Sequence, residues 1–174
     1  LAIILFVTGA CSEQNKDEYG NLKVYITDAP FPIEFIESAN IIVTKVDARV
    51  KAIDGEGEFA ILSEDTLQLE LRNGITEKMI DLDIPAGDLD LIRLYVDEAS
   101  LSLTNGDVYS VKVPSGQQTG IKVFIDPALT ITGGLISELL LDFNLEKSFV
   151  LQGNMNTPED IKGFHFKPVI RAIR

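Results

Sequence analysis

The stretch IIVTKVDARVK, residues 41–51, decides the fold of this chain. Within it, apolar and charged residues alternate: Ile42, Val46, Ala48 and Val50 against Lys45, Asp47, Arg49 and Lys51. Successive side chains of a β-strand point to opposite faces, so the alternation predicts a long strand with one buried face and one face in water. Antiparallel sheets commonly combine two such faces.

The same two-residue period extends in both directions from this stretch. On the amino-terminal side, Leu22, Val24 and Ile26 share one face of a predicted strand. On the carboxyl-terminal side, the alternation predicts that Arg93 and Tyr95 point outward and that their apolar neighbours Ile92, Leu94 and Val96 point inward. Asn105-Gly106 stands between two alternating runs and predicts a tight hairpin, because both residues tolerate positive φ.

Short strands separated by turn signals fill the rest of the chain. They are predicted over residues 58–62, 76–84, 108–113, 121–125, 139–143, 149–151 and 163–173. Asp54-Gly55, Asp126-Pro127 and Gly133-Gly134 mark turns, and residues 66–72 fit either a strand or one helical turn. About nine strands, with a turn every 8–12 residues or so, predict one all-β domain over residues 21–174, an antiparallel sandwich or barrel.

The charge of the chain bears on its partners. The 174 residues include 15 Lys and Arg against 27 Asp and Glu, which gives a net charge of −12. Such a surface repels phosphate backbones, so nucleic acid is not expected as a partner. An acidic surface can also gather divalent cations loosely, but a solvated surface is the favoured interpretation.

The first twenty residues are typical of an exported lipoprotein. An apolar run at residues 1–7, too short to span a bilayer, leads into Thr8-Gly9-Ala10-Cys11, which resembles a bacterial lipobox. We therefore expect residues 1–10 to be a signal peptide truncated at its start, and residues 11–20 to be a lipidated Cys11 with a polar tether. The expected location is the bacterial outer membrane, facing the periplasm or the exterior. The alternative is a buried strand with Cys11 as a core thiol.

No catalytic constellation is evident in the sequence, so no enzyme and no cofactor or metal site is predicted. The single histidine, His165, lies between two phenylalanines and is expected to face away from them on a strand. One histidine and one cysteine do not make a zinc site. Asp81 and Asp83 share a strand face, where a hydrolase could use a pair of carboxyls, but a solvated acidic face is the favoured interpretation.

Four residues are the candidates for ligand contact. Asp28 is expected on the same face of its strand as Leu22, where a buried apolar residue would be usual. A turn in which its carboxylate accepts from nearby backbone N–H groups before Pro30 is favoured over a ligand or metal role. The aromatics expected to face outward are Tyr25, Tyr95 and Tyr109, each of which could also cover a sheet.

Five strings, in this order, resemble a known family. They are residues 20–30 (GNLKVYITDAP), 84–87 with 92–94, 113–116 with 120–123, 141–144 (LDFN) and 166–171 (FKPVIR). Together they are similar to the domain-of-unknown-function family 4382, found in bacterial and archaeal envelope proteins. The resemblance implies a β-sandwich of transthyretin-like or immunoglobulin-like shape in a lipoprotein or surface context. It implies no activity and no catalytic residues.

Three functions are consistent with these expectations. The first is a non-enzymatic binding or adhesion module for glycan, matrix or an envelope protein. The second is a structural or assembly subunit of an envelope complex, and the third, with least support, is a hydrolase using an acidic pair. An exposed aromatic platform would favour a glycan, whereas a large apolar patch would favour a protein partner.

Overall fold

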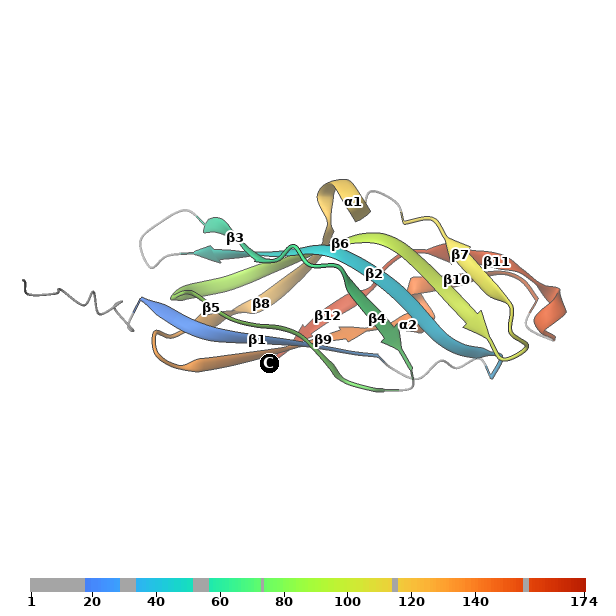
Figure 1. Cartoon of the computed structure of the whole chain (residues 1–174), viewed down its shortest axis with the longest axis horizontal. Helices are drawn as coiled ribbons and strands as arrows, with labels where there is room; N and C mark the ends of the chain where they lie inside the picture. Colours follow the sequence, from blue (N-terminus) through green and yellow to red (C-terminus); the bar gives the residue numbers. More distant parts are fainter. Residues whose placement is uncertain (1–17, 29–33, 52–56, 73, 114–115, 155–156) are drawn as a thin grey trace, which may run out of the picture.

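The computed structural model describes residues 18–28, 34–51, 57–72, 74–113, 116–154 and 157–174, and these form an all-β, largely antiparallel sandwich (Figure 1). Cys11 and its tether lie outside the described residues. In the described part of the chain, no helix has the length and apolar content needed to cross a membrane. The helical elements are the single turns α1 (Gly116–Thr119), α2 (Leu145–Ser148) and η1 (Pro158–Asp160).

The larger sheet is built on two long central strands, β2 (Ile36–Lys51) and β6 (Gly87–Leu103), which pair antiparallel along most of their length. Two short strands share the free edge of β2: β3 (Gly57–Ser63) and β4 (Leu67–Leu71). Two more share the free edge of β6: β7 (Val108–Val111) and β8 (Ile121–Ile131). The stretch 41–51 therefore lies at the centre of this sheet, as the long alternation predicts.

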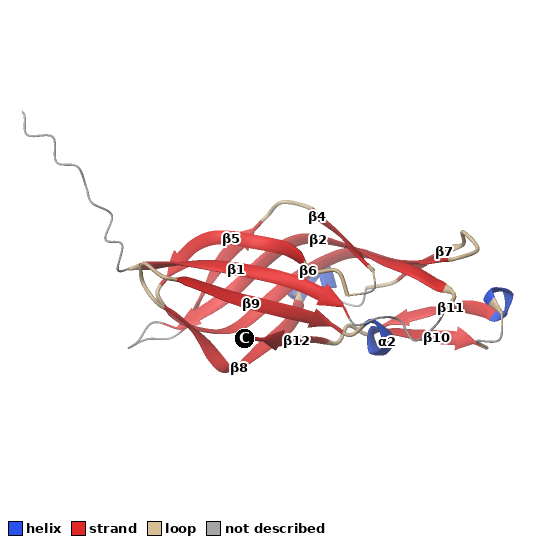
Figure 2. Ribbon diagram, turned by 90° about the horizontal axis from the view of Figure 1, so that it is seen from below, coloured by secondary structure: helices blue, strands red, loops and turns tan. Residues whose placement is uncertain are grey.

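The smaller sheet has the order β12-β9-β1-β5 and covers the other side of the core (Figure 2). Its strands are β1 (Tyr19–Asp28), β5 (Glu77–Pro85), β9 (Ile136–Phe143) and β12 (Ile170–Ile173). β1 pairs antiparallel with β5 but parallel with β9. The parallel pair departs from the purely antiparallel sandwich that the sequence predicted.

A two-stranded hairpin completes the fold. β10 (Phe149–Gly153) pairs with β11 (Ile161–Phe166) near β7, at the end of the molecule opposite the start of β1 (Figures 1 and 2). Tyr109 ties this hairpin to the larger sheet, because its hydroxyl donates to the Ile161 carbonyl at 3.1 Å and its ring meets Phe164 edge to face.

The core lies between the two sheets and is formed by their inward-facing apolar residues. Leu22, Val24 and Ile26 from the smaller sheet and Val46, Ala48 and Ile92 from the larger sheet are all at most 1% exposed. These six predicted inward positions are therefore confirmed, and they come from both sheets. Burial of this apolar surface is the main source of stability.

Irregularities in strand pairing change which residues reach the core. The pairing of β2 with β6 shifts around Val43, so that Ile41 and Val43 are buried while Ile42, predicted to be inward, is only half-buried. The pairing of β6 with β8 shifts between Leu89 and Leu91. An extra residue at such a bulge turns every later side chain of the strand to the opposite face of the sheet.

Several predicted boundaries need correction. Residues 66–72 contain a strand, β4, and not a helical turn. The predicted final strand 163–173 is two strands, because Pro168 lies in the break between β11 and β12. Asp126-Pro127 lies inside β8, at its pairing irregularity, where the missing N–H of proline is tolerated. The described residues thus form twelve strands and not nine.

Candidate binding face

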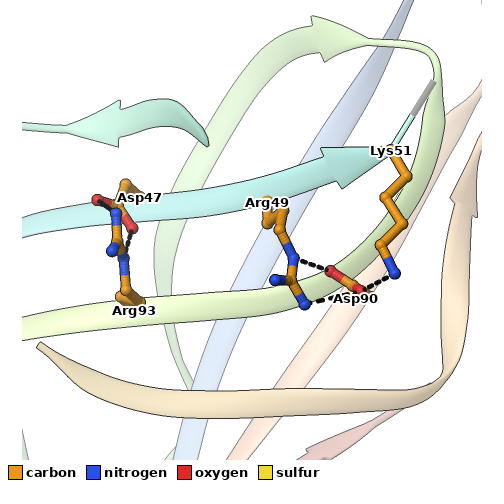
Figure 3. Close-up of polar contacts among 5 residues, drawn as sticks. All are labelled: Asp47, Arg49, Lys51, Asp90 and Arg93. Carbon is orange, nitrogen blue, oxygen red and sulfur yellow. Dashed lines mark hydrogen bonds and ion pairs between the residues drawn. The ribbon is translucent and has the colours of Figure 1, made fainter. Parts of the chain in front are cut away.

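The outer face of the larger sheet carries a buried carboxylate at its centre. Asp47 points away from the core on β2, as predicted, yet only 2% of the residue is exposed. Its two carboxylate oxygens each accept from the Arg93 guanidinium, at 2.6 Å from Nε and 2.6 Å from Nη2 (Figure 3). Tyr95 donates its hydroxyl to the same carboxylate at 3.1 Å. Charge-assisted, two-pronged bonds of this kind are among the strongest in proteins.

The pairing register brings these groups together. Asp47 and Arg93 are direct cross-strand partners on β2 and β6, although 46 residues separate them in the sequence. Tyr95 follows on the same face of β6. The Asp47 carboxylate raises the pKa of Arg93 through its hydrogen bonds, and burial raises the pKa of Tyr95, with the bond to Asp47 adding to that shift. Arg93 is therefore a fixed cation.

Phe59 on β3 lies against this cation. The Arg93 guanidinium carbon is 3.6 Å from the centre of the Phe59 ring, so one face of the ring is covered. Phe59 is nevertheless 44% exposed. Part of the Phe59 ring therefore meets solvent while the Arg93 guanidinium contacts it.

Three cross-strand rows around Asp47 form what we call the three-row face. They are Lys45 with Tyr95; Ile61, Asp47, Arg93 and Lys122; and Phe59, Arg49, Leu91 and Phe124. Ile61 and Phe124 are 52% and 65% exposed. With a strand spacing of about 4.8 Å, the four strands place Phe59 and Phe124 roughly 14 Å apart. A rigid sheet therefore displays two separate aromatic rings on one surface.

The three-row face is positively charged on an acidic chain. It holds four of the 15 basic residues, Lys45, Arg49, Arg93 and Lys122, and one of the 27 acidic residues, Asp47. Its formal charge is therefore +3, whereas the whole chain carries −12. Lys45 extends over the Tyr95 ring, with its Nζ 5.4 Å from the ring centre.

Acidic residues border the face on β6. Asp90 accepts from Arg49 Nε at 2.8 Å and Nη2 at 3.0 Å, and its other ion pair is to Lys51 Nζ at 2.6 Å (Figure 3). The hydrogen bonds from Arg49 hold the pKa of Asp90 below its ordinary value. At the opposite border Asp97 accepts from Gln117 of α1. The following Gly120 has φ +67° and lies against Arg93 and Tyr95, where a Cβ would come within 3.1 Å of the Arg93 Cβ.

Of the four predicted contact residues, only Tyr95 lies on this face. Tyr25 is on the outer face of the smaller sheet, where its hydroxyl donates to Glu138 at 3.3 Å. Tyr109 was also predicted to face outward, but it lies on the core side of β7 and packs against the hairpin described above. His165 is exposed and faces away from the buried Phe164 and Phe166, as predicted.

Asp28 is buried at the end of β1, with an exposed fraction of 4%. Its Oδ1 accepts from the backbone N–H of Gly74, 46 residues away, at 3.0 Å. The predicted turn before Pro30 falls on residues that lie outside the described part of the chain. Its buried Oδ2 has no hydrogen-bond partner among the described residues. Burial raises the pKa of this carboxyl, the bond from Gly74 opposes that shift, and the charge of Asp142 adds to it. The bond to Gly74 joins the end of β1 to the turn before β5.

Substitution of Asp28 tests the raised pKa of its carboxyl through the effect of pH on stability. The folded-state pKa is above the ordinary 3.8, so the native state binds more protons than the unfolded state in the interval between the two values. The contribution of Asp28 to stability therefore decreases as the pH rises through that interval. We expect Asp28→Asn to gain stability relative to the native chain between pH 4 and pH 8 in urea unfolding.

The control for Asp28→Asn is Asp28→Ala, which also removes the acceptor for Gly74 N–H and should cost about 1 kcal/mol. A stability difference between Asp28→Asn and the native chain that does not change with pH would contradict the raised pKa.

The described residues give little support for metal or acid–base chemistry. They contain no group of three or more His, Cys, Asp or Glu side chains placed to hold a metal ion. Asp81 and Asp83 share the exposed face of β5, but Asp81 pairs with Lys78 at 2.7 Å. That hydrogen bond lowers the pKa of Asp81, whereas a general acid needs a raised one.

The fold and this surface define an all-β sandwich protein with an exposed aromatic and basic sheet face. The chain belongs to the family described as a domain of unknown function, DUF4382, whose model matches residues 19–168. The family resemblance seen in the sequence is thereby confirmed. No curated protein matches the chain in sequence.

The sequence did not indicate Phe59, Ile61 or Phe124 as surface residues of interest. The alternation does contain a sign of them, because each is an apolar residue at a position that faces outward on its strand. An apolar residue at an outward position is common on protein surfaces. Only the pairing of β3 and β8 on either side of β2 and β6 brings them to one surface.

Proposed function

We propose that this chain is the folded body of a bacterial cell-envelope lipoprotein and that its sandwich is a non-enzymatic binding module. The three-row face is the binding surface. The observation that carries the proposal is the display of Phe59 and Phe124 on one rigid sheet, with Arg93 fixed between strands by Asp47. Aromatic and arginine side chains supply most of the binding energy in protein interfaces, and rigid anchors lose little entropy on binding.

The binding surface is tested with a double substitution. Phe59→Ala with Phe124→Ala removes both exposed rings, and we expect binding to a glycan array or to envelope extracts to weaken at least about tenfold, because each exposed anchor contributes on the order of 1 kcal/mol or more. Circular dichroism and thermal unfolding of the same variant verify the fold. The matched control is Val108→Ala with Ile136→Ala, two side chains that are each 62% exposed and lie outside the three-row face.

Two results separate the candidate functions. Capture of glycan through Phe59 and Phe124 supports the binding module, whereas a stable complex with one envelope protein through the same residues supports the alternative of an assembly subunit. Equal retention by the aromatic variant and its control would contradict the role of the three-row face.

The envelope location is a separate part of the proposal and depends on Cys11. A diacyl or triacyl group on a mature amino-terminal cysteine anchors a protein stably, whereas one acyl chain holds it only marginally. Mass spectrometry of the membrane fraction should find Cys11 acylated. An unmodified Cys11 in a protein that fractionates away from membranes would contradict this part.

A further inference from the structure

We propose that the ligand of the three-row face is an acidic polysaccharide. Sugar rings would lie on Phe59 and Phe124, and the carboxylates of the sugars would be bound by Lys45 and Lys122. This inference rests on the proposed binding function and adds the chemical class of the ligand.

The formal charge of the three-row face is opposite in sign to that of the whole chain. The three-row face carries +3 on a chain of −12, so an acidic polymer is attracted to this surface and repelled by most others. Asp47 and Arg93 form an ion pair whose opposite charges offset each other, and Asp90 at the border of the face does the same for Arg49. The attraction from the exposed Lys122 and the half-buried Lys45 therefore acts directly on the ligand.

The three-row face also exposes two aromatic side chains, Phe59 and Phe124. The Arg93 guanidinium carbon lies 3.6 Å from the centre of the Phe59 ring and thereby helps to hold the ring in place, while Phe59 stays 44% exposed. A flat aromatic face suits one side of a sugar ring, because the C–H bonds on that side form an apolar surface that can lie on the ring. Phe124, roughly 14 Å away across the four strands, offers a second ring along the same ligand. An extended chain of sugars contacts both rings without a cleft.

Arg93 acts as a positioning residue for Phe59. Both of its bonded nitrogens, Nε and Nη2, are committed to Asp47. Arg93 contributes to binding by orienting Phe59. Arg93→Lys should therefore weaken binding, because lysine keeps the charge but lacks the planar guanidinium that bonds Asp47 twice and stacks on the ring. If Arg93→Lys weakens binding but leaves the dependence of the Kd on NaCl unchanged, Arg93 acts by positioning Phe59. Loss of a direct charge contact with the ligand would change that dependence as well.

The experiment compares probes of different charge on the purified chain. We expect polygalacturonate or alginate to bind, with a Kd that rises with NaCl because salt screens exposed charges. Neutral dextran should bind weakly or not at all. Lys45→Gln with Lys122→Gln should weaken binding of the acidic glycan by roughly three- to tenfold, since each exposed ion pair contributes up to about 1 kcal/mol. The matched control, Lys162→Gln with Lys167→Gln, removes the same charge from exposed residues at β11 and should leave the Kd unchanged.

Three outcomes would overturn the inference. If neutral and acidic glycans bind equally through Phe59 and Phe124, the binding function stands and the acidic ligand is wrong. If poly-glutamate or anionic phospholipid vesicles bind more tightly than any acidic glycan, the ligand is an acidic protein segment or a lipid surface. If both lysine pairs weaken binding equally, the attraction comes from the charge of the whole chain and not from this face.

Discussion

Arg93→Ala should lower the free energy of unfolding by about 3 kcal/mol, because it leaves a buried carboxylate without its main partner. The Asp47 side chain is 2% exposed and would keep only the hydroxyl of Tyr95. The cost of a buried, uncompensated charge exceeds the value of the bond itself, since desolvation of the ion is no longer offset. Urea unfolding at neutral pH measures the loss.

The same sheet provides a matched control for this prediction. Arg49 makes the same two-pronged contact with Asp90, but the Asp90 side chain is 16% exposed and also pairs with Lys51 at 2.6 Å. Arg49→Ala should therefore cost about 1 kcal/mol or less. The double substitution Asp47→Val with Arg93→Leu removes both charges together and should cost much less than Arg93→Ala. Equal losses for Arg93→Ala and Arg49→Ala would show that burial of Asp47 is not what makes the difference.

Phe143→Ala should also destabilise the fold by about 3–5 kcal/mol, through loss of transfer energy and formation of a cavity. Phe143 is 1% exposed on β9, the strand that joins β1 to β12 in the smaller sheet. Its ring stacks on Phe166 of the hairpin, with ring centres 6.3 Å apart and an angle of 15° between the planes. The substitution therefore weakens the smaller sheet and its contact with β11 together.

The comparison for Phe143→Ala is Phe124→Ala, which removes the same side chain from a position that is 65% exposed. That variant should unfold within about 0.5 kcal/mol of the native chain. Equilibrium denaturation of both variants, with equal m-values, measures the difference. A small loss for Phe143→Ala would mean that the core between the hairpin and the smaller sheet is not closely packed. A stable Phe124→Ala is also needed for the binding experiments.

The inward and outward faces of the strands could be read from the sequence because they depend on a local property. Asp47 and Arg93 were correctly predicted to point outward, and Val46 and Ile92 were correctly assigned as buried or inward. Alternation fails where a bulge inserts one residue. Leu91 follows such an irregularity in β6 and lies on the outer face opposite Phe124, buried at 4%.

The candidate site was not predictable in the same way. Tyr95 was the one predicted contact residue that proved to lie on it, whereas Phe59 and Phe124 belong to edge strands on opposite sides of the sheet. Nothing within either strand indicates which neighbour it will have. The hydrogen bond from Gly74 to Asp28 is equally unpredictable from local sequence, because the two residues meet only when β1 and the turn before β5 have come together.

The sequence by itself determined that this chain is an all-β domain, most of the residues that fill the core, and which family it belongs to, because periods of two residues and short motifs are local properties of a chain. Tertiary structure alone decided the strand order, the parallel pairing of β1 with β9, and the contacts of Arg93 with Asp47 and Phe59. The physical reason is that pairing between distant strands is selected by the packing of the whole core. The pairing therefore cannot be predicted from any single stretch of residues.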